Sequence, residues 1–485
     1  MTEINKTRIL SSLFWKFLER GGALGLQFLV QVVLARLLLP EDFGTIALVY
    51  VFISISVVFV ESGFGIALVQ KKEVDEVDFS SVFYLSILVS TLFYFLLFFT
   101  APHIAHFYNM PNIVKIIRVL AANLVFYAIN SIQYAIVARN FQFKLLFFRS
   151  TGALLVSGAV GITLAHAGYG LWAIVGQQIT NQLAITLILW FTLRWRPRLL
   201  FSFARVRELF SFGWKLLSSS LLSTTYRELH NLVMGKIFDP VTLGNYNRGQ
   251  QFPSFIVSNI DGSIHAVMFP VLATHQDDVS KVKNVMRRSI LSSSFVVFPL
   301  MAGLAATAES VIRIVLTDKW LSSVPFLQIA CAGFALMPIQ TANLQTINAL
   351  GRSDIFLRLE IFKKTIGMII LGVTAFWGIY AIAYGGVVTA ILSSFINAIP
   401  NKKLLDYSYG EQVKDVAPSL FLSLFMGTIV YTLKWLGLSS GLTLAIQLAT
   451  GVILYLGIAK MINMASYVYL IQTMKSIFSR KKNVC

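Results

Sequence analysis

Polar side chains recur at helical spacing inside a long apolar stretch near the start of the sequence. Four of them in the stretch 10–33 step by four, seven and four positions; they are Lys16, Arg20, Gln27 and Gln31. At about 100° per residue these side chains share one face of a helix. Basic groups bind anions such as phosphate, and amides hydrogen-bond hydroxyl groups. The spacing therefore predicts a polar stripe with the chemistry of a ligand-binding surface.

Three other apolar stretches carry comparable polar faces. In 212–235 the residues on one side are Lys215, Ser219, Tyr226 and His230, with Arg227 and Glu228 beside them. In 247–271 steps of three and four join Gln251, Ser254, Ser258, Asp261 and His265, and in 43–66 Ser54 and Glu61 share a face. A charge at the centre of a bilayer costs about 2.5–3.5 kcal/mol on insertion scales, so such residues usually face a partner or a water-filled cavity. The stripes predict a shared polar cavity.

Each of these charges also has a structural interpretation. Lys16 and Lys215 lie near the ends of their stretches, where a long side chain reaches the aqueous interface. Glu61 and Asp261 fit a counter-ion for a cation, a coupling site for a transported ion, or a partner that only fixes packing. For the two histidines hydrogen-bonded packing is the favoured interpretation.

The composition of the chain places these residues in a membrane. Of its 485 residues 56% are hydrophobic and 13% charged, and the mean hydropathy is +0.73. Soluble domains average about 45–50% apolar and about 25% charged residues. The composition therefore excludes a soluble enzyme, a nucleic-acid-binding protein and a disordered scaffold. In a membrane protein the informative feature of the net charge of +18 is where the basic residues lie along the chain.

About fourteen stretches reach the roughly 20 apolar residues that a membrane-spanning helix needs. Their approximate ranges are 10–33, 43–66, 81–103, 116–138, 150–167, 170–193, 212–235, 247–271, 289–308, 324–347, 361–377, 379–398, 418–437 and 440–462. The predicted fold class is therefore all-α, with multiple passes through the membrane. Gly378 favours a hairpin over one long helix across 361–398, and Pro40 with Glu41 and Asp42 predicts the start of a helix.

Basic residues predict the orientation of the chain. Most of the 40 Lys and Arg lie at the two ends of the chain and in alternate connections, near residues 71–72, 139–149, 194–207, 281–288, 352–364 and 402–414. Connections rich in Lys and Arg are cytoplasmic. Both termini are therefore expected in the cytoplasm, with the last segment, 463–485, forming a basic tail. Cys331 and Cys485 are expected at different depths and unpaired, and the first stretch is expected to be a span and not a cleaved signal peptide.

The chain resembles itself at a spacing of about 200 residues, the signature of an internal repeat. Pro40 and Gly44 correspond to Pro240 and Gly244, and Glu61 corresponds to Asp261. Each repeat holds six spans, so the two copies enter the membrane from the same side and are parallel. We expect an N-terminal lobe over 1–200, a C-terminal lobe over 201–400 and two extra helices within 401–462.

Enzyme motifs are absent from the sequence. It has no Walker loop, no glycine-rich dinucleotide loop and no metal-ligand spacing beyond a lone pair, His103 and His106. We therefore expect a protein that is not an enzyme and has no cofactor and no metal site.

Several short motifs resemble those of a known family. They are 33–38 running into 40–44, 63–70, 170–173 with 177–178, 194–197, 212–213 and 243–246. With two six-span halves and two further spans, the chain is similar over nearly its whole length to Wzx-type flippases, close to the colanic-acid exporter branch of the multidrug/oligosaccharidyl-lipid/polysaccharide exporter superfamily. The resemblance implies a V-shaped, MATE-like transporter of the bacterial cytoplasmic membrane. It would flip an undecaprenyl-pyrophosphate-linked oligosaccharide to the outer leaflet by alternating access, for exopolysaccharide, capsule or O-antigen synthesis.

The resemblance implies a ligand for the residues of the polar stripes. The predicted pyrophosphate-binding residues are Arg20, Arg248, Lys16, Lys215 and Arg227, because a guanidinium stays charged and binds phosphate oxygens bidentately. The predicted sugar-binding residues are Gln27, Gln31, Ser219, Gln251 and Asn259, and the predicted coupling or counter-ion residues are Glu61 and Asp261. Expected partners are the lipid-linked oligosaccharide, membrane lipid, a polysaccharide polymerase and a chain-length regulator, with no nucleic acid.

Two alternatives stay open. A cation-coupled drug exporter of the same architecture predicts an acidic, apolar-walled cavity, against which the intramembrane basic residues argue. A membrane enzyme of lipid-linked glycan assembly predicts a large outer loop or an acidic catalytic motif. The longest outer connection, near 309–323, is short.

Overall fold

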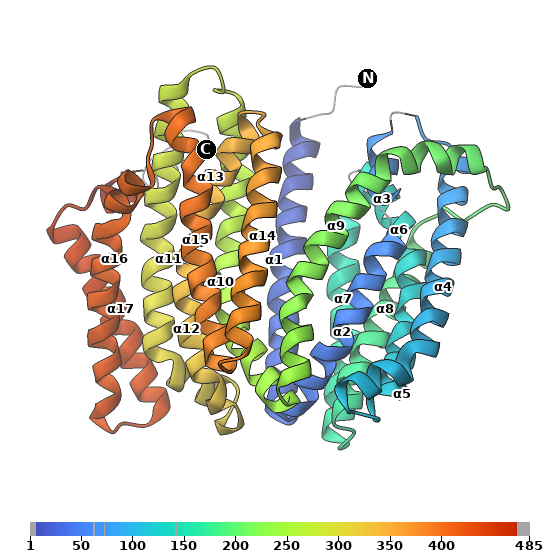
Figure 1. The fold of residues 1–485 in the computed structure, drawn as a ribbon, viewed down its shortest axis with the longest axis horizontal. Helices are drawn as coiled ribbons and strands as arrows, with labels where there is room; N and C mark the ends of the chain where they lie inside the picture. The colour runs from blue at the N-terminus through green and yellow to red at the C-terminus, as the bar shows by residue number, and fades with distance from the viewer. Residues whose placement is uncertain (1–5, 62–63, 72, 141–142, 473–485) are drawn as a thin grey trace. The chain divides into compact units, whose positions relative to one another are not determined.

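The computed structural model describes residues 6–61, 64–71, 73–140 and 143–472; the side chains of 6–20, 143, 145, 212, 263, 265–267 and 269–270 lie outside this description (Figure 1). The described residues form helices and short connections, with no strand among them. The chain divides into two compact units, the first ending at Gly244 and the second beginning at Asn245.

The first unit is built from nine helices and the first turn of a tenth. They are α1 (Lys6–Leu37), α2 (Pro40–Glu61), α3 (Phe64–Gln70), α4 (Glu76–Tyr108), α5 (Ile113–Ala121), α6 (Asn123–Arg139), α7 (Phe143–His166), α8 (Leu171–Thr192), α9 (Phe203–Ile237) and the start of α10 (Pro240–Ala273). α7 packs on both α1 and α8, and α9 packs along α2, α3 and α4.

The second unit holds the rest of α10 and the helices that follow. They are α11 (Val279–Val315), the short 3-10 helix η1 (Asp318–Ser323), α12 (Val324–Ala335), α13 (Met337–Ala349), α14 (Ser353–Ala375), α15 (Ile379–Leu405), α16 (Tyr409–Thr432), η2 (Leu433–Leu436) and α17 (Ser440–Met461). α11 lies against α12, α13, α16 and α17, and is the helix around which this unit is packed.

Each of the fourteen predicted spans coincides with a helix or with two consecutive helices, so the all-α prediction is confirmed. Among the described residues, nine helical segments are long and apolar enough to cross a membrane. α8, α9, α10 and α14 are not among the nine, and α1 contributes only a shorter apolar segment, Gly21–Leu37. Polar side chains lower the mean hydropathy of these helices, and many of the predicted site residues lie on α9 and α10.

Local signals in the sequence set several helix ends. Pro40 begins α2, with Glu41 and Asp42 in its first turn, as predicted, because an acid near a helix N-terminus complements the helix dipole. The predicted hairpin is also present: α14 ends at Ala375, α15 begins at Ile379, and Gly378 between them has a φ of 99°. A positive φ at this turn is available to glycine without the steric cost that a Cβ would bring.

An ion-pair cluster ties the start of α9 to the first half of the chain. Lys71 lies 3.1 Å from Asp78 and 3.2 Å from Glu208, and Arg205 lies 3.3 Å from Asp75. Asp75 also caps α4, and the hydrogen bond from the Asp78 backbone N–H lowers the pKa of its carboxyl below the ordinary value. α9 therefore belongs to the first unit, although the sequence repeat had predicted a boundary near 200. The repeat-based lobes stay a prediction.

The repeat-equivalent turns meet through their backbones. A Cβ added to Gly44 would lie 1.8 Å from the carbonyl oxygen of Pro240, and one added to Gly244 would lie 2.0 Å from the carbonyl oxygen of Pro40. The contact is reciprocal, as two copies of one Pro-x-x-x-Gly turn would give. Only glycine lets two helix starts approach this closely.

Candidate functional site

A polar pocket lies inside the first unit. Its volume is about 440 Å³, and its described lining consists of Gln27 and Gln31 from α1, Tyr50 from α2, Tyr127 from α6, and Gln177, Gln178, Asn181 and Gln182 from α8. Every one of these side chains is an amide or a phenol, and none carries a formal charge. Such groups both donate and accept hydrogen bonds. The lining thus fits a neutral ligand that is rich in hydroxyl groups.

The pocket is polar because four amides share one face of α8. Gln177, Gln178, Asn181 and Gln182 follow one another at steps of one, three and one, so their side chains point to the same side of the helix. Within a membrane span such residues usually face the interior of the protein. This face of α8 therefore meets the polar residues of α1, α2 and α6.

Two glycines of α7 set the distances between the helices that carry these amides. A Cβ added to Gly161 would lie 2.7 Å from the Cβ of Gln177, and one added to Gly158 would lie 2.8 Å from Val30 Cγ2. Small residues let membrane helices approach closely. The glycines therefore hold α8 and α1 against α7 and fix where Gln177 and the α1 amides stand.

The amides of the pocket keep unused hydrogen-bonding capacity. The Ser157 hydroxyl donates to Asn181 Oδ1 at 3.4 Å, and Tyr127 hydrogen-bonds Gln182. Gln178 Oε1 is buried and has no hydrogen-bond partner among the described residues. A buried polar atom without a partner costs about 1–3 kcal/mol. A ligand hydroxyl donating to Gln178 would remove that cost.

Two of the predicted sugar-binding residues lie in this pocket. Gln27 and Gln31 line it, and their binding of sugars stays a prediction. α1 also carries Lys16 and Arg20, whose side chains lie outside the described part of the structure. The stripe did not predict Tyr50 or Tyr127. The spacing of the α8 amides is a signal for a polar face that the sequence contains, although Gln177 and Gln178 entered the predictions only through the family resemblance.

The predicted residues of α9 are exposed on the first unit. Lys215 and Ser219 are exposed. Arg227 lies 3.3 Å from Glu228, which also accepts a hydrogen bond from the Asn231 amide at 3.1 Å. Glu61, at the end of α2, is exposed, and its charge acts on Tyr127 in the polar pocket. The first unit therefore places Glu61 near the pocket. The role of the α9 cations stays a prediction.

The predicted residues of α10 after Gly244 belong to the second unit. Arg248 is only 5% exposed; its guanidinium donates to Gln251 Oε1 and stacks on the Trp320 ring at 5.0 Å. The Asn259 amide donates to the Phe255 carbonyl at 2.6 Å. Asp261 is partly buried. Arg248 and Gln251 thus already bind each other, and their binding of a pyrophosphate or a sugar stays a prediction.

Arg149 is a buried cation that the sequence patterns did not predict. Arg149 was placed with the basic residues of a cytoplasmic connection, but it lies in α7, is 2% exposed and stacks on the Tyr134 ring at 4.0 Å. A guanidinium over an aromatic face is attracted by the ring quadrupole. The sequence pattern does not indicate this burial, because Arg149 stands at the predicted start of a span.

The sequence of this chain matches a known family. The family model described as "Polysaccharide biosynthesis protein" matches residues 33–325. The chain is 24% identical over 416 residues to the teichuronic acid biosynthesis protein TuaB of Bacillus subtilis, covering 82% of this chain and 84% of that protein. It is 24% identical over 437 residues to the lipopolysaccharide biosynthesis protein WzxC of Escherichia coli, covering 88% of each. The predicted resemblance is confirmed.

Solved structures share the fold. The lipid II flippase MurJ, in an inward closed conformation, matches with a TM-score of 0.74 at 15% identity, over 94% of this chain and 99% of that one. An inward-facing multidrug resistance MATE family transporter of the MOP superfamily matches with a TM-score of 0.60 at 13% identity, over 79% of this chain and 96% of that one. The fold is therefore that of a multi-pass, MATE-like membrane protein.

Proposed function

Because this chain belongs to the polysaccharide biosynthesis protein family, we propose that it is a flippase for a lipid-linked oligosaccharide. The substrate would be an undecaprenyl-pyrophosphate-linked repeat unit, moved by alternating access from the inner to the outer leaflet of the cytoplasmic membrane. The names of TuaB and WzxC refer to the biosynthesis of teichuronic acid and lipopolysaccharide, which supports a lipid-linked precursor of such a glycan as the transported substrate. MurJ, a lipid II flippase, has the same fold.

The polar pocket of the first unit is the observation that carries this proposal. Its described lining is made of neutral amides and phenols, which suit the many hydroxyl groups of a sugar. A cation-coupled drug exporter would instead need a carboxylate and apolar walls, and the described lining contains neither. In this proposal Gln27, Gln31 and the α8 amides bind the sugars, and Ser219, Gln251 and Asn259 add contacts elsewhere along the path.

The pyrophosphate requires cations that the pocket does not supply. We assign this part to Arg20 and Arg248, with Lys16, Lys215 and Arg227 assisting. A membrane potential contributes about 2.3 kcal/mol per charge per 100 mV. An inside-negative potential would therefore drive the anionic substrate outward, provided that the protein's cations do not move with it. Glu61 and Asp261 would act as counter-ions of these cations or as the binding site of a coupled ion.

The protein in this proposal performs no covalent chemistry and needs no cofactor. It lies in the bacterial cytoplasmic membrane with both termini in the cytoplasm, as the basic connections predict. A polymerase and a chain-length regulator would use the flipped repeat unit on the outer face. Removal of the product by polymerisation would then pull transport forward.

The test is the movement of a labelled undecaprenyl-pyrophosphate oligosaccharide across proteoliposome membranes. We expect the intact protein to flip this substrate. The single variants Gln178→Leu and Gln182→Leu should each slow flipping about threefold to tenfold, because one hydrogen bond contributes about 0.5–1.5 kcal/mol. Gln70→Leu is the matched control, since Gln70 is exposed at the end of α3 and lies outside the pocket.

The variants separate the parts of the proposal. Loss of flipping in Arg20→Ala and Arg248→Ala would support the pyrophosphate assignment, and full activity in both would move that site elsewhere. Full activity in both amide variants would remove the pocket from the sugar path. If several glycans fail to move while a cationic drug is taken up along an ion gradient, the flippase proposal is wrong and the exporter replaces it.

A further inference from the structure

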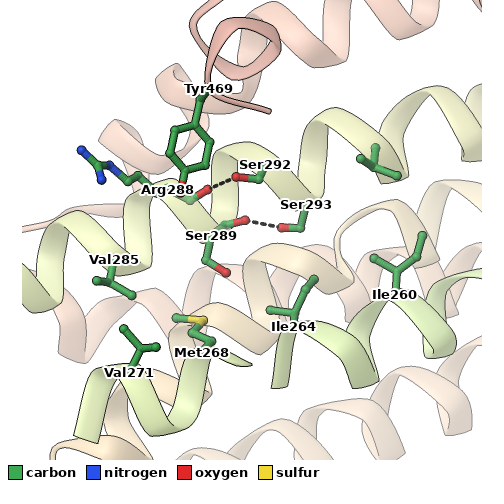
Figure 2. A pocket seen from close by; sticks show the side chains of 11 residues that line it. Ile260, Ile264, Met268, Val271, Val285, Arg288, Ser289, Ser292, Ser293 and Tyr469 are labelled. Atoms are coloured by element: carbon green, nitrogen blue, oxygen red, sulfur yellow. Dashed lines mark hydrogen bonds between the residues drawn. The ribbon is translucent and has the colours of Figure 1, made fainter. Parts of the chain in front are cut away.

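An apolar groove with one basic end runs along the second unit. It has a volume of about 520 Å³ and lies between α10 and α11, beside the helical segment 465–472 that follows α17. Figure 2 shows Val271 and Met268 of α10 facing Val285 of α11, with Arg288 near this end of the groove and Tyr469 beside it. All of these residues belong to the second unit, so the groove is separate from the polar pocket of the first unit.

The groove has the chemistry of a hydrocarbon site over most of its length. Its exposed lining is mainly apolar, from residues such as Ile260, Ile264 and Val296. The hydroxyls of Ser292 and Ser293 donate to the carbonyl oxygens of Arg288 and Ser289 in their own helix, so they do not make the groove polar. Protein interiors contain few voids larger than a water molecule. In a bilayer, an open apolar channel of this size is filled by a lipid chain.

The basic end has the chemistry of a headgroup site. Arg288 is exposed and lies 5.5 Å from the Tyr469 ring. Its neighbour Arg287 is paired with Asp415 at 2.5 Å, whereas no carboxylate pairs with Arg288 among the described residues. An arginine fork binds two phosphate oxygens at once. The Arg288 guanidinium can therefore bind an anionic headgroup at the mouth of the apolar channel.

The groove lies at the membrane end that the basic residues mark as cytoplasmic. Arg288 stands in the first three turns of α11, close in sequence to Lys281 and Lys283. Lys283 donates to the Asp406 carbonyl and Lys281 pairs with Asp278. Basic pockets between membrane helices on this side bind anionic lipid headgroups.

From this arrangement we propose that the groove is a binding site for an anionic phospholipid of the cytoplasmic leaflet. The phosphate would lie against Arg288, with the Tyr469 hydroxyl beside it, and one acyl chain would follow the channel between α10 and α11. The site does not depend on flippase activity, because it lies outside the polar pocket. It would anchor the segment 465–472 to α11 through a lipid that both elements contact.

The first test is native mass spectrometry of the intact protein with defined lipids. We expect phosphatidylglycerol to stay bound at higher collision energy than phosphatidylethanolamine. Arg288→Gln should weaken phosphatidylglycerol binding about fivefold, since one basic residue near an anionic surface contributes about 1 kcal/mol. Lys403→Gln is the matched control, because Lys403 is an exposed cation near the end of α15 that does not line the groove.

A second test needs no variant and stands even if Arg288→Gln fails to fold. Phosphatidylglycerol with a photoreactive acyl chain should label peptides of α10 and α11 between residues 256 and 296. Labelling elsewhere, or unchanged binding in a folded Arg288→Gln, would overturn the proposal. So would displacement of phosphatidylglycerol by an equal amount of undecaprenyl phosphate, because the groove would then belong to the carrier lipid. A dimer that buries Tyr469 and excludes lipid would also contradict it.

Discussion

Three buried amides join three helices of the second unit. Asn343 of α13 donates to Gln412 of α16 at 2.8 Å, and Asn401 of α15 donates to Asn343 Oδ1 at 2.7 Å. Each of the three side chains is fully buried. Removing the Asn343 side chain leaves Gln412 Oε1 without its donor and the Asn401 amide with only its 3.3 Å hydrogen bond to the Asn343 backbone carbonyl. The amides therefore fix how α13, α15 and α16 pack.

Asn343→Ala tests this network at the residue scale. We expect it to lower the free energy of unfolding by about 1–3 kcal/mol, because Gln412 Oε1 loses its donor and the Asn401 amide loses its shorter hydrogen bond. The measurement is thermal unfolding in detergent micelles. Asn284→Ala is the matched control, since Asn284 is exposed on α11. Equal melting temperatures for the two variants would show that the network adds nothing to stability.

At the residue scale, spacing along one helix correctly grouped two side chains on one face. Gln27 and Gln31 lie four apart and line the same pocket, while their sugar-binding role stays a prediction. Asn343 and Gln412 are 69 positions apart, and no periodicity within one helix links them. Arg149 could not be recognised as buried, because its burial depends on Tyr134 of a neighbouring helix. Contacts between residues on different helices depend on how the helices pack, and the spacing of residues along one helix does not predict that packing.

At the scale of elements, the approach of α7 to α8 holds the polar pocket together. Gly161→Ala would place a Cβ 2.7 Å from Gln177 Cβ, so α8 must move. Gly152→Ala on the same helix would meet only Ile188 Cδ1, at 3.6 Å, which is ordinary contact. Without a clash, Gly→Ala inside a helix is favourable by about 0.5–1 kcal/mol. We expect Gly152→Ala to be neutral or stabilising, and Gly161→Ala to lower the melting temperature and slow oligosaccharide flipping.

The two glycine variants control for each other, because they make the same chemical change in α7. Melting curves in detergent give the stability, and flipping is measured in proteoliposomes at equal protein incorporation. A Gly161→Ala protein as stable and as active as Gly152→Ala would mean that the close approach does not position Gln177.

The helices themselves were the most predictable elements, because a bilayer demands about 20 apolar residues per span. The breaks inside them were not. The predicted span 116–138 is two helices, α5 and α6, which meet at Ala122, and 324–347 divides into α12 and α13 at Leu336. Pro338 in the first turn of α13 gives a reason for the second break, since proline suits a helix start. Ala122 carries no comparable signal.

At the scale of the whole molecule, the two Pro-x-x-x-Gly turns that the sequence repeat pairs are also in contact in the structure. The repeat paired Gly44 with Gly244, and the backbone of each turn contacts the other. The repeat could not predict that α9 packs on α2, α3 and α4. That packing includes the ion pairs of Lys71 with Glu208 and of Arg205 with Asp75. A hydropathy pattern does not predict such pairs between residues far apart in the sequence.

The orientation of the whole molecule in the membrane can be tested at the two connections that flank α8. Tyr169 and Leu199 lie in the connections before and after α8, and their side chains are 59% and 93% exposed. The connection with Leu199 also holds Arg194, Arg196 and Arg198, so the positive-inside rule places it in the cytoplasm. With Cys331 and Cys485 removed, Tyr169→Cys should react with a membrane-impermeant maleimide in intact cells. Leu199→Cys should react only after lysis. The reverse pattern would invert the topology and place Arg288 and its groove in the outer leaflet, which would contradict the lipid site proposed there.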